Sequence, residues 1–462
     1  MSSPSSDPAA LLRSRRYVGL LILAAILGVP ISAAAYGFLA LVSGLQEWLF
    51  TDLPGALGFD GTPLWWPLPL LALAGVLVGL TIRYLPGRGG HSPADGFEAG
   101  GVPSPIELPG IAIAALATLS LGAVLGPEAP LIALGAGLAG SAVRLARRDV
   151  PAQATAVVAA AGSFAAISTL LGSPLLGAFL LMEASGLGGP TLGLVLVPGL
   201  VAAGVGSLIF IGLDAWTGLG TYSLALPDVP PFAQPDLAQF GWALVIGLVA
   251  AVVGTGIRRL ALALRPHVER RLLLATPLVG VAVGTLAIVY AQASGHNFSE
   301  VLFSGQNALG PLISNSASYS VGALVLLVAC KGLAYGASLA GFRGGPVFPA
   351  MFLGAAGGIA LSHLPGLPLV PGVAMGIGAM SVVLLRLPLT SVLLATLLLA
   401  EDGLAVMPLV IVAVAVAYVA SARLTPPATA TPAAPTTATP AEARVQASPT
   451  PAQRPVSPER KR

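Results

Sequence analysis

Long apolar runs separated by short polar stretches dominate this chain between residues 17 and 424. Six of the runs approach or exceed the ~20 residues that a helix needs to cross a bilayer. These six are 17–42, 64–84, 191–213, 238–262, 272–291 and 321–340. Two further apolar stretches, 111–144 and 346–364, are interrupted by glycine and proline, which break helices. The pattern predicts an all-α polytopic membrane protein in which some of the tilted helices are broken.

The broken stretches belong to an internal repeat. Residues 126–130 (GPEAP) match residues 345–349 (GPVFP), and a Leu-Gly-Ala triplet follows both at the same spacing. Further along the chain, residues 162–175 match residues 376–389 at nearly the same offset. Two matches at nearly one offset indicate a duplicated half. Many transporters are built from such halves in inverted orientation, so we expect two inverted-topology repeats.

The repeat and the charge pattern divide the chain into five predicted segments. They are a cytoplasmic N-terminus (1–16), a first membrane half (17–213), an extracytoplasmic linker (214–237), a second membrane half (238–424) and a disordered tail rich in Pro, Ala and Thr (425–462). Basic residues cluster near the N-terminus and in 144–148, whereas acidic residues dominate 214–236. The positive-inside rule then predicts a multi-pass protein of the cell membrane with a cytoplasmic N-terminus.

Composition excludes several classes of function. Only 9% of the residues are charged, against roughly 25% in soluble domains, so much of the surface must face lipid. The net charge of +3 lies in the tail, and the neutral membrane body excludes a nucleic-acid partner. The single cysteine and four scattered histidines form no metal or redox motif, so we expect no cofactor. The carboxylates are isolated from one another, which argues against a membrane-embedded enzyme.

The repeated Gly-Pro segments carry the candidate chemistry. A proline at a helix start has no N–H to lose, and glycine lets the backbone approach an ion closely. The free N–H groups of a first helical turn carry roughly half a positive charge, so two facing turns attract an anion. Glu128, at the start of the first broken helix, is placed where an anion would bind and is a candidate tethered competitor. The sequence therefore predicts an anion path between the repeats, near the bilayer midplane.

Three segments resemble motifs of the CLC family of chloride channels and chloride/proton exchangers. Residues 126–130 are similar to the family's G-[KR]-E-G-P, residues 344–349 to G-G-x-F-x-P, and residues 172–175 (GSPL) to the N-A-P-L helix start. The likeness extends from about residue 75 to residue 407. It implies a homodimer in the lipid bilayer, in which each subunit has its own pore between two inverted halves. It also implies that Glu128 is the gating glutamate.

The resemblance further implies which residues bind chloride or a similar small anion, mainly through backbone N–H groups. They are Gly90, Ser92, Gly126, Pro127, Ala129, Gly345, Pro346, Val347 and Phe348. Two departures from the family leave the identity of the anion open. Gly90 stands where the family has a coordinating serine, although Ser92 is close in sequence. The family's late tyrosine has no counterpart, because Tyr418 comes too early in the chain.

Proton coupling in the exchangers of the family uses a second, inner glutamate. Here Ala184 stands at the matching position, and Glu183, one residue earlier, is the candidate proton relay. The missing glutamate favours a passive channel, with a chloride/proton antiporter as the alternative. A third alternative is a non-conducting family member that acts as a sensor or partner. Lys331, near a basic position of the family, is expected to snorkel toward water or to pair with an acidic residue.

Overall fold

The computed structural model describes residues 13–97, 101–146, 150–186, 190–224, 226, 231–232, 234–399 and 402–425. The described residues up to Leu424 belong to one compact unit. Most of the predicted N-terminal segment, part of the predicted linker, and all of the predicted tail except Thr425 lie outside the described residues. The segment boundaries there remain predictions.

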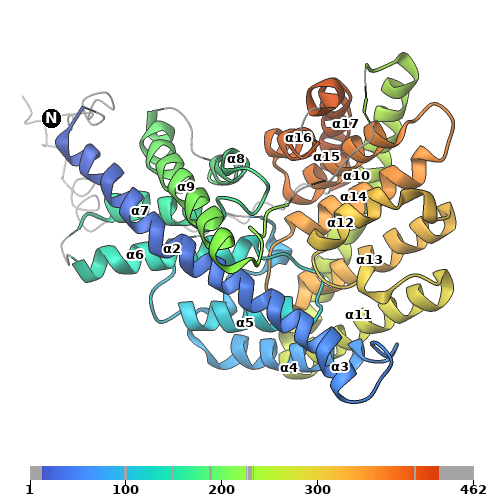
Figure 1. Cartoon of the computed structure of the whole chain (residues 1–462), viewed down its shortest axis with the longest axis horizontal. Helices are drawn as coiled ribbons and strands as arrows, with labels where there is room; N and C mark the ends of the chain where they lie inside the picture. The colour runs from blue at the N-terminus through green and yellow to red at the C-terminus, as the bar shows by residue number, and fades with distance from the viewer. Residues whose placement is uncertain are drawn as a thin grey trace, which may run out of the picture. The chain divides into compact units, whose positions relative to one another are not determined.

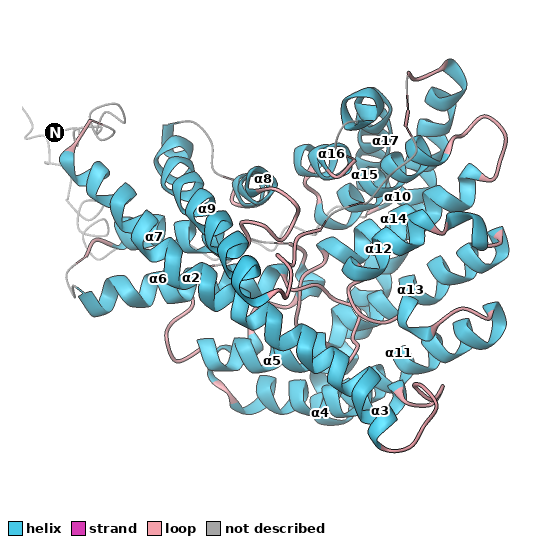
Figure 2. Cartoon of the chain, in the orientation of Figure 1, coloured by secondary structure: helices cyan, strands magenta, loops and turns pink. Residues whose placement is uncertain are grey.

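The described part of the chain is almost entirely helical (Figures 1 and 2). The helices are α2 (Arg15–Glu47), α3 (Leu53–Ala56), α4 (Pro67–Tyr84), α5 (Leu108–Ser120), α6 (Glu128–Ala146), α7 (Ala152–Ala166), α8 (Pro174–Ala184), α9 (Pro190–Thr217), α10 (Leu237–Arg270), α11 (Leu272–Ser294), α12 (Gln306–Ser314), α13 (Val321–Gly341), α14 (Val347–Ser362), α15 (Leu369–Leu385), α16 (Pro388–Leu397) and α17 (Gly403–Leu424). Among the described residues, the only β pairing is an isolated bridge. The predicted all-α fold is confirmed.

The predicted apolar runs correspond to the long helices α2, α4, α9, α10, α11 and α13. Each of them is long and apolar enough to cross a membrane, as are α6 and α17 among the described helices. The structure extends some of the runs: α10 continues to Arg270, and α9 continues to Thr217, into the predicted linker. The predicted interruption of 111–144 is a real break, because α5 ends at Ser120 and α6 begins at Glu128.

The internal repeat is visible in how the helices pack. Packing of α2 on α9 and of α6 on α7 in the first half recurs as packing of α10 on α17 and of α14 on α15 in the second. The corresponding helices are therefore α2 and α10, α4 and α11, α5 and α13, α6 and α14, α7 and α15, α8 and α16, and α9 and α17. Two of these pairs, α4 with α11 and α8 with α16, also contact each other across the boundary between the halves. Equivalent elements thus meet around an approximate twofold axis, as expected for inverted repeats.

Glycine allows the closest of these helix contacts. A Cβ on Gly135 of α6 would overlap the backbone of Gly162 of α7, and the converse also holds. The equivalent pair in the second half, Gly354 and Gly376, makes the same contact between α14 and α15. Small residues at helix crossings are the usual means of packing helices in a membrane, where lipid supplies no hydrophobic drive for helix association.

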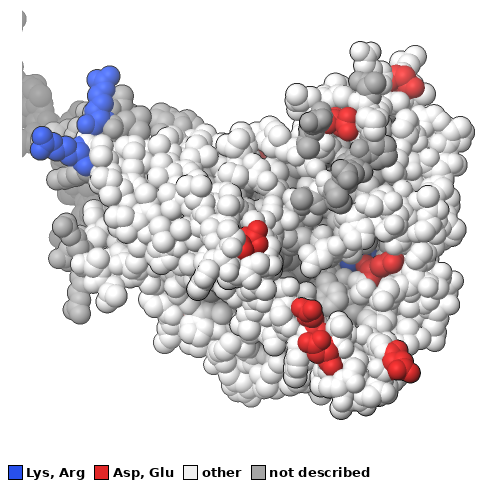
Figure 3. All heavy atoms as spheres, in the orientation of Figure 1, with Lys and Arg blue, Asp and Glu red and all other residues white. Residues whose placement is uncertain are grey.

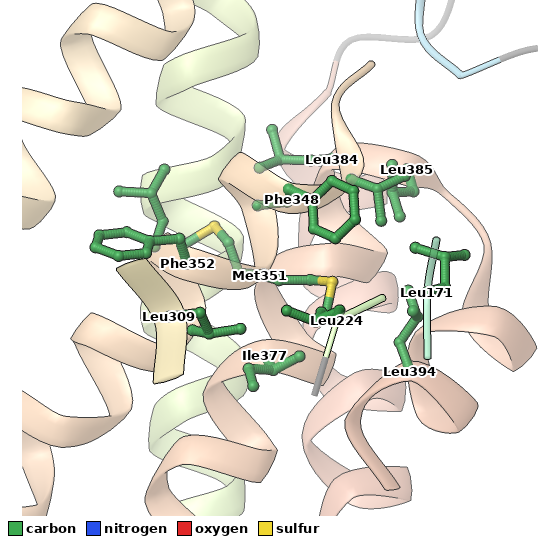
Figure 4. Packing of buried hydrophobic residues seen from close by; sticks show 14 of the residues in the cluster. Leu171, Leu224, Leu309, Phe348, Met351, Phe352, Ile377, Leu384, Leu385 and Leu394 are labelled. Atoms are coloured by element: carbon green, nitrogen blue, oxygen red, sulfur yellow. The ribbon is translucent and has the colours of Figure 1, made fainter. Parts of the chain in front are cut away.

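The interior and the surface both fit a membrane environment. Around α14, buried apolar side chains such as Phe348, Met351 and Ile377 pack from several helices of the second half (Figure 4). On the face shown in Figure 3, charged side chains are few and widely spaced. Large apolar side chains such as Leu208 and Leu274, each 69% exposed, point outward from the long helices. The chain is therefore a multi-pass membrane protein.

Candidate functional site

The two repeated Gly-Pro segments meet directly at the approximate twofold axis. The N–H of Gly126 donates to the carbonyl of Gly345 at 2.7 Å, and the N–H of Gly345 donates to the carbonyl of Gly126 at 2.6 Å. This antiparallel bridge joins equivalent residues of the two halves. Because α6 begins at Glu128 and α14 at Val347, the bridge brings the N-terminal ends of both helices to one place.

The Glu128 side chain lies between these two helix ends. It is fully buried, with 0% of its surface exposed. Its Oε1 accepts a hydrogen bond of 2.8 Å from the N–H of Phe348, in the first turn of α14. The N–H groups of Glu128 itself and of Val347 also lie close to the carboxylate. Glu128 therefore does more than cap its own helix: its charge is stabilised by the positive N-terminal end of the equivalent helix in the other repeat.

The second carboxylate oxygen of Glu128 is held much less well. Its Oε2 is buried and has no hydrogen-bond partner among the described residues. The slot is also tight, because a Cβ on Gly126 or on Gly345 would overlap this carboxylate. Leaving a buried polar atom unpaired costs about 1–3 kcal/mol, and more for a charged group. The carboxylate thus occupies a position prepared for a negative charge while its own hydrogen bonding is incomplete.

A cavity of about 360 Å³ adjoins the segment that follows Glu128. Its lining includes Gly90, Ala129, Pro346 and Arg343, and we call it the arginine cavity. The Arg343 guanidinium donates to backbone carbonyls, from Nη1 to Phe342 at 3.1 Å and from Nε to Arg88 at 3.4 Å. Among the described residues no carboxylate forms an ion pair with Arg343, but Glu107 also lines the cavity, and its Oε2 accepts from the N–H of Ser104 at 2.7 Å. The cavity therefore has one residue of each charge in its lining, with the guanidinium next to the Gly-Pro segment.

A smaller cavity of about 60 Å³ adjoins the segment that precedes Glu128. Its lining includes Pro127, Ser304, Gln306 and Asn307 but no charged residue, and we call it the amide cavity. The last two of these residues begin α12, and the Gln306 Nε2 donates to the carbonyl of Tyr222 at 2.9 Å. Residues on either side of Glu128 therefore line different cavities, with the buried carboxylate between them.

Most of the predicted anion-binding residues gather at this place, but Ser92 does not. Gly90 lines the arginine cavity, whereas Ser92 is absent from its lining. The Ser92 carbonyl instead accepts from the N–H of Asp95 at 3.1 Å, in a single 3₁₀ turn (Pro93–Asp95). Tyr418, which comes too early in the chain to match the family's late tyrosine, is 41% exposed on α17. Neither hydroxyl is therefore placed to replace the coordinating side chains that the family would supply.

Glu183 lies near the end of α8, and its carboxylate reaches the start of α16 in the other half. Its Oε1 accepts from the N–H of Leu389 at 3.0 Å. Its Oε2 accepts from the N–H and the Oγ1 of Thr390, at 2.7 and 2.6 Å. Three donors at the N-terminus of α16 thus hold the carboxylate, which acts as a cap for that helix. The geometry gives the predicted relay residue a structural role that the sequence did not indicate.

Three residues near the site were missed or misjudged from the sequence. Tyr335 is fully buried, and its hydroxyl donates to the carbonyl of Pro346 at 2.9 Å. Arg343 directly precedes the second Gly-Pro motif, a position that could have drawn attention to it. Lys331 neither snorkels nor pairs with an acidic side chain among the described residues: it is 0% exposed and donates to backbone carbonyls. The prediction for Lys331 was wrong, because the fold supplies enough carbonyls to keep the ammonium inside.

Several known proteins and solved structures are similar to this chain. "Putative ion-transport protein YfeO" from Escherichia coli is 28% identical over 364 residues, which cover 77% of this chain and 82% of the relative. The YfeO protein of Escherichia fergusonii matches to the same extent. The structure of "a slow cyanobacterial Cl-/H+ antiporter" superposes with a TM-score of 0.68 at 18% identity, over 88% of this chain and 94% of that one. That of "a CLC-type fluoride/proton antiporter" gives 0.62 at 19% identity, over 87% and 95%.

At such identities the two structures establish the shared fold alone. The family assignment rests on the sequence match: residues 74–422 match the family described as "Voltage gated chloride channel". This segment is well over half of the chain and includes both Gly-Pro motifs and Glu128. The chain therefore belongs to the CLC family of voltage gated chloride channels.

Proposed function

We propose that this protein exchanges chloride, or a similar small anion, for protons across the cell membrane, and that Glu128 is its gate. One observation carries the proposal: the Glu128 carboxylate accepts the Phe348 N–H in a slot between two helix N-termini, where a transported anion would bind. Family membership supports small-anion transport. The proposal adds the coupling to protons and the residue that provides it.

The proposed path leads from the amide cavity, past the bridged Gly126 and Gly345, to the arginine cavity. An anion that reaches the slot takes over the Phe348 N–H and displaces the Glu128 carboxylate. Outside the slot the carboxylate takes up a proton, and the protonated side chain no longer competes with the anion for the Phe348 N–H. Each return of Glu128 to the slot releases that proton and expels the anion. The Arg343 charge raises the local anion concentration at one end of the path.

Two observations bear on whether the protein is a proton-coupled antiporter or a passive channel, and they point in opposite directions. Both superposed structures are named as proton-coupled antiporters, which supports antiport over the passive channel that the sequence favoured. The second candidate, a passive anion channel, is favoured by Ala184 at the position of the inner glutamate and by the binding of Glu183 to α16. If the protein is an antiporter, we propose that protons reach Glu128 from the inner side through water, and not through Glu183.

The orientation and assembly of the protein are also part of the proposal. The distribution of basic residues supports a cytoplasmic N-terminus in the cell membrane. For the homodimer, the adjacent helices α8 and α16 offer an apolar face: Leu175, Leu389 and Leu397 are 53%, 46% and 45% exposed. A second copy of the chain would cover these side chains.

Flux measurements on purified protein in liposomes test the function. We expect chloride efflux from chloride-loaded vesicles, accompanied by proton movement in the opposite direction at a fixed ratio. Protein-free vesicles and a panel of nitrate, fluoride and sulfate provide the controls. Chloride efflux without proton movement would establish the passive channel instead. No flux of any anion would support the non-conducting sensor or partner.

The Glu183→Gln variant separates a helix cap from a proton relay. The neutral amide keeps one acceptor oxygen but loses the charge that interacts with the N-terminus of α16. We therefore expect proton coupling to remain unchanged while the free energy of unfolding falls by about 1 kcal/mol. Thermal unfolding in detergent and coupled flux in liposomes provide the two measurements, with exposed Glu47→Gln as the control. Loss of proton coupling at normal stability would make Glu183 a relay after all.

A further inference from the structure

Lys331 is held inside the protein in the manner of a bound ion. Its Nζ donates to four consecutive backbone carbonyls, those of residues 300–303, at 2.9, 3.1, 3.0 and 3.3 Å. The side chain is fully buried on α13, and the Nζ also lies 4.5 Å from the centroid of the Phe352 ring. An ammonium has three N–H donors, so the four carbonyls provide one acceptor more than the number of its donors.

The carbonyls converge on Lys331 because of the local backbone. Residues Phe298–Glu300 form a single 3₁₀ turn, and Phe303 ends the segment in the left-handed region with φ 58°. The carbonyls of residues 300–303 converge on the Lys331 Nζ, and they carry partial negative charge, as do the free carbonyls at the C-terminus of a helix. A ring of backbone carbonyls is also how proteins replace the hydration shell of a monovalent cation.

No acidic side chain among the described residues forms an ion pair with the Lys331 ammonium. The carbonyls of residues 300–303 are therefore the groups that offset its charge. The nearby Glu300 carboxylate already accepts hydrogen bonds from two hydroxyls, those of Tyr290 at 2.5 Å and Tyr319 at 2.9 Å. The contact between Lys331 and Glu300 runs through the backbone carbonyl of Glu300. The segment is therefore a cradle for a positive charge, independent of any salt bridge.

The same segment leads directly into the wall of the amide cavity. Residues Ser304, Gln306 and Asn307, which line that cavity, follow the four carbonyls along the chain. The N–H of Phe303 donates to the carbonyl of Gly122 at 3.2 Å, which joins the segment to the break between α5 and α6. Because the ammonium holds the carbonyls on one side, the polar groups after Phe303 face the cavity on the other.

We propose that Lys331 is a built-in cation, a tethered substitute for a bound monovalent ion, which positions residues 300–307 and thereby sets the anion affinity of the amide cavity. The anion-binding part of this inference rests on the proposed function. Lys331 acts as a positioning residue, because the segment lies between its ammonium and the cavity.

Removing the side chain while supplying cations from solution tests the inference. The Lys331→Ala variant leaves an empty cradle, so its thermal unfolding midpoint should be low in N-methyl-D-glucamine chloride and should recover in ammonium or potassium chloride at equal ionic strength. Wild type and Cys330→Ala, the neighbouring buried residue, should show no such dependence on the cation. In Lys331→Met the apolar side chain fills the space, so added cations should restore nothing.

The affinity for chloride distinguishes a positioning role of Lys331 at the amide cavity from a role in stability alone, because stability alone would leave the affinity unchanged. In the glucamine salt, the half-saturating chloride concentration of Lys331→Ala should rise about tenfold, and ammonium should return it toward the wild-type value. Equal stability of Lys331→Ala in all the salts, or failure to fold in every one of them, would overturn the cradle. Unchanged chloride affinity in a cation-dependent variant would overturn its link to the amide cavity. If wild type transports no anion, the proposed function fails, but the cation dependence of unfolding still decides the cradle.

Discussion

Replacing Glu128 is expected to abolish proton movement in liposomes. Two variants should distinguish the loss of the exchangeable proton from the removal of the side chain that fills the slot. In Glu128→Gln the neutral amide cannot exchange a proton and lacks the charge that the α14 N-terminus stabilises. We expect proton flux to fall about tenfold or more, whereas anion flux should continue at a level below that of Glu128→Ala, because the amide still spends part of its time in the slot. In Glu128→Ala the slot is empty, so anion flux should persist, uncoupled from protons and independent of pH.

Paired recordings of chloride efflux and lumenal pH measure both effects. Glu47→Gln, which changes an exposed carboxylate at the end of α2, provides the control and should behave as wild type. Proton coupling that survives in Glu128→Ala would rule out Glu128 as the gate. Equal anion flux in the Gln and Ala variants would show that the carboxylate does not block the path.

The Gly345→Ala variant is expected to damage the same slot from the opposite side. A Cβ at Gly345 would overlap the Glu128 carboxylate, so the carboxylate must leave the slot or the bridge to Gly126 must distort. Overpacking of this kind costs about 1–3 kcal/mol of folding free energy. Thermal unfolding in detergent should show the loss of stability, and flux assays should show weakened proton coupling.

The glycines of α14 provide a matched control for this prediction. Gly357 lies on α14, the helix that begins two residues after Gly345, and a Cβ there would meet nothing within 4 Å, so Gly357→Ala should be neutral. The double variant Gly345→Ala/Glu128→Ala should regain most of the lost stability, because the alanine at 128 removes the overlapping atoms. Additive losses in the double variant would contradict the proposed clash.

The apolar runs and the repeat allowed much of the fold to be predicted. Apolar length alone identifies a spanning helix, because lipid requires the backbone to satisfy its own hydrogen bonds. Proline and glycine at 126–130 and 345–349 marked the helix breaks, since their backbone preferences are local. The predicted end of the first membrane half at 213 fell short of Thr217, because helix ends depend on the surrounding contacts.

For the candidate site, too, features that depend on neighbouring residues could be predicted, whereas contacts between distant segments could not. The order of residue types along the chain is enough to predict a membrane protein of two repeats with a carboxylate at the start of a broken helix. Three contacts could be found only in the folded molecule: the Phe348 N–H, 220 residues away, holds Glu128, Glu183 caps α16, and Lys331 stays inside. The Glu128 and Glu183 contacts join the two halves, and the Lys331 contacts join two segments within the second half. Their distances are set by how helices and loops pack in three dimensions, and not by the residues that precede or follow them.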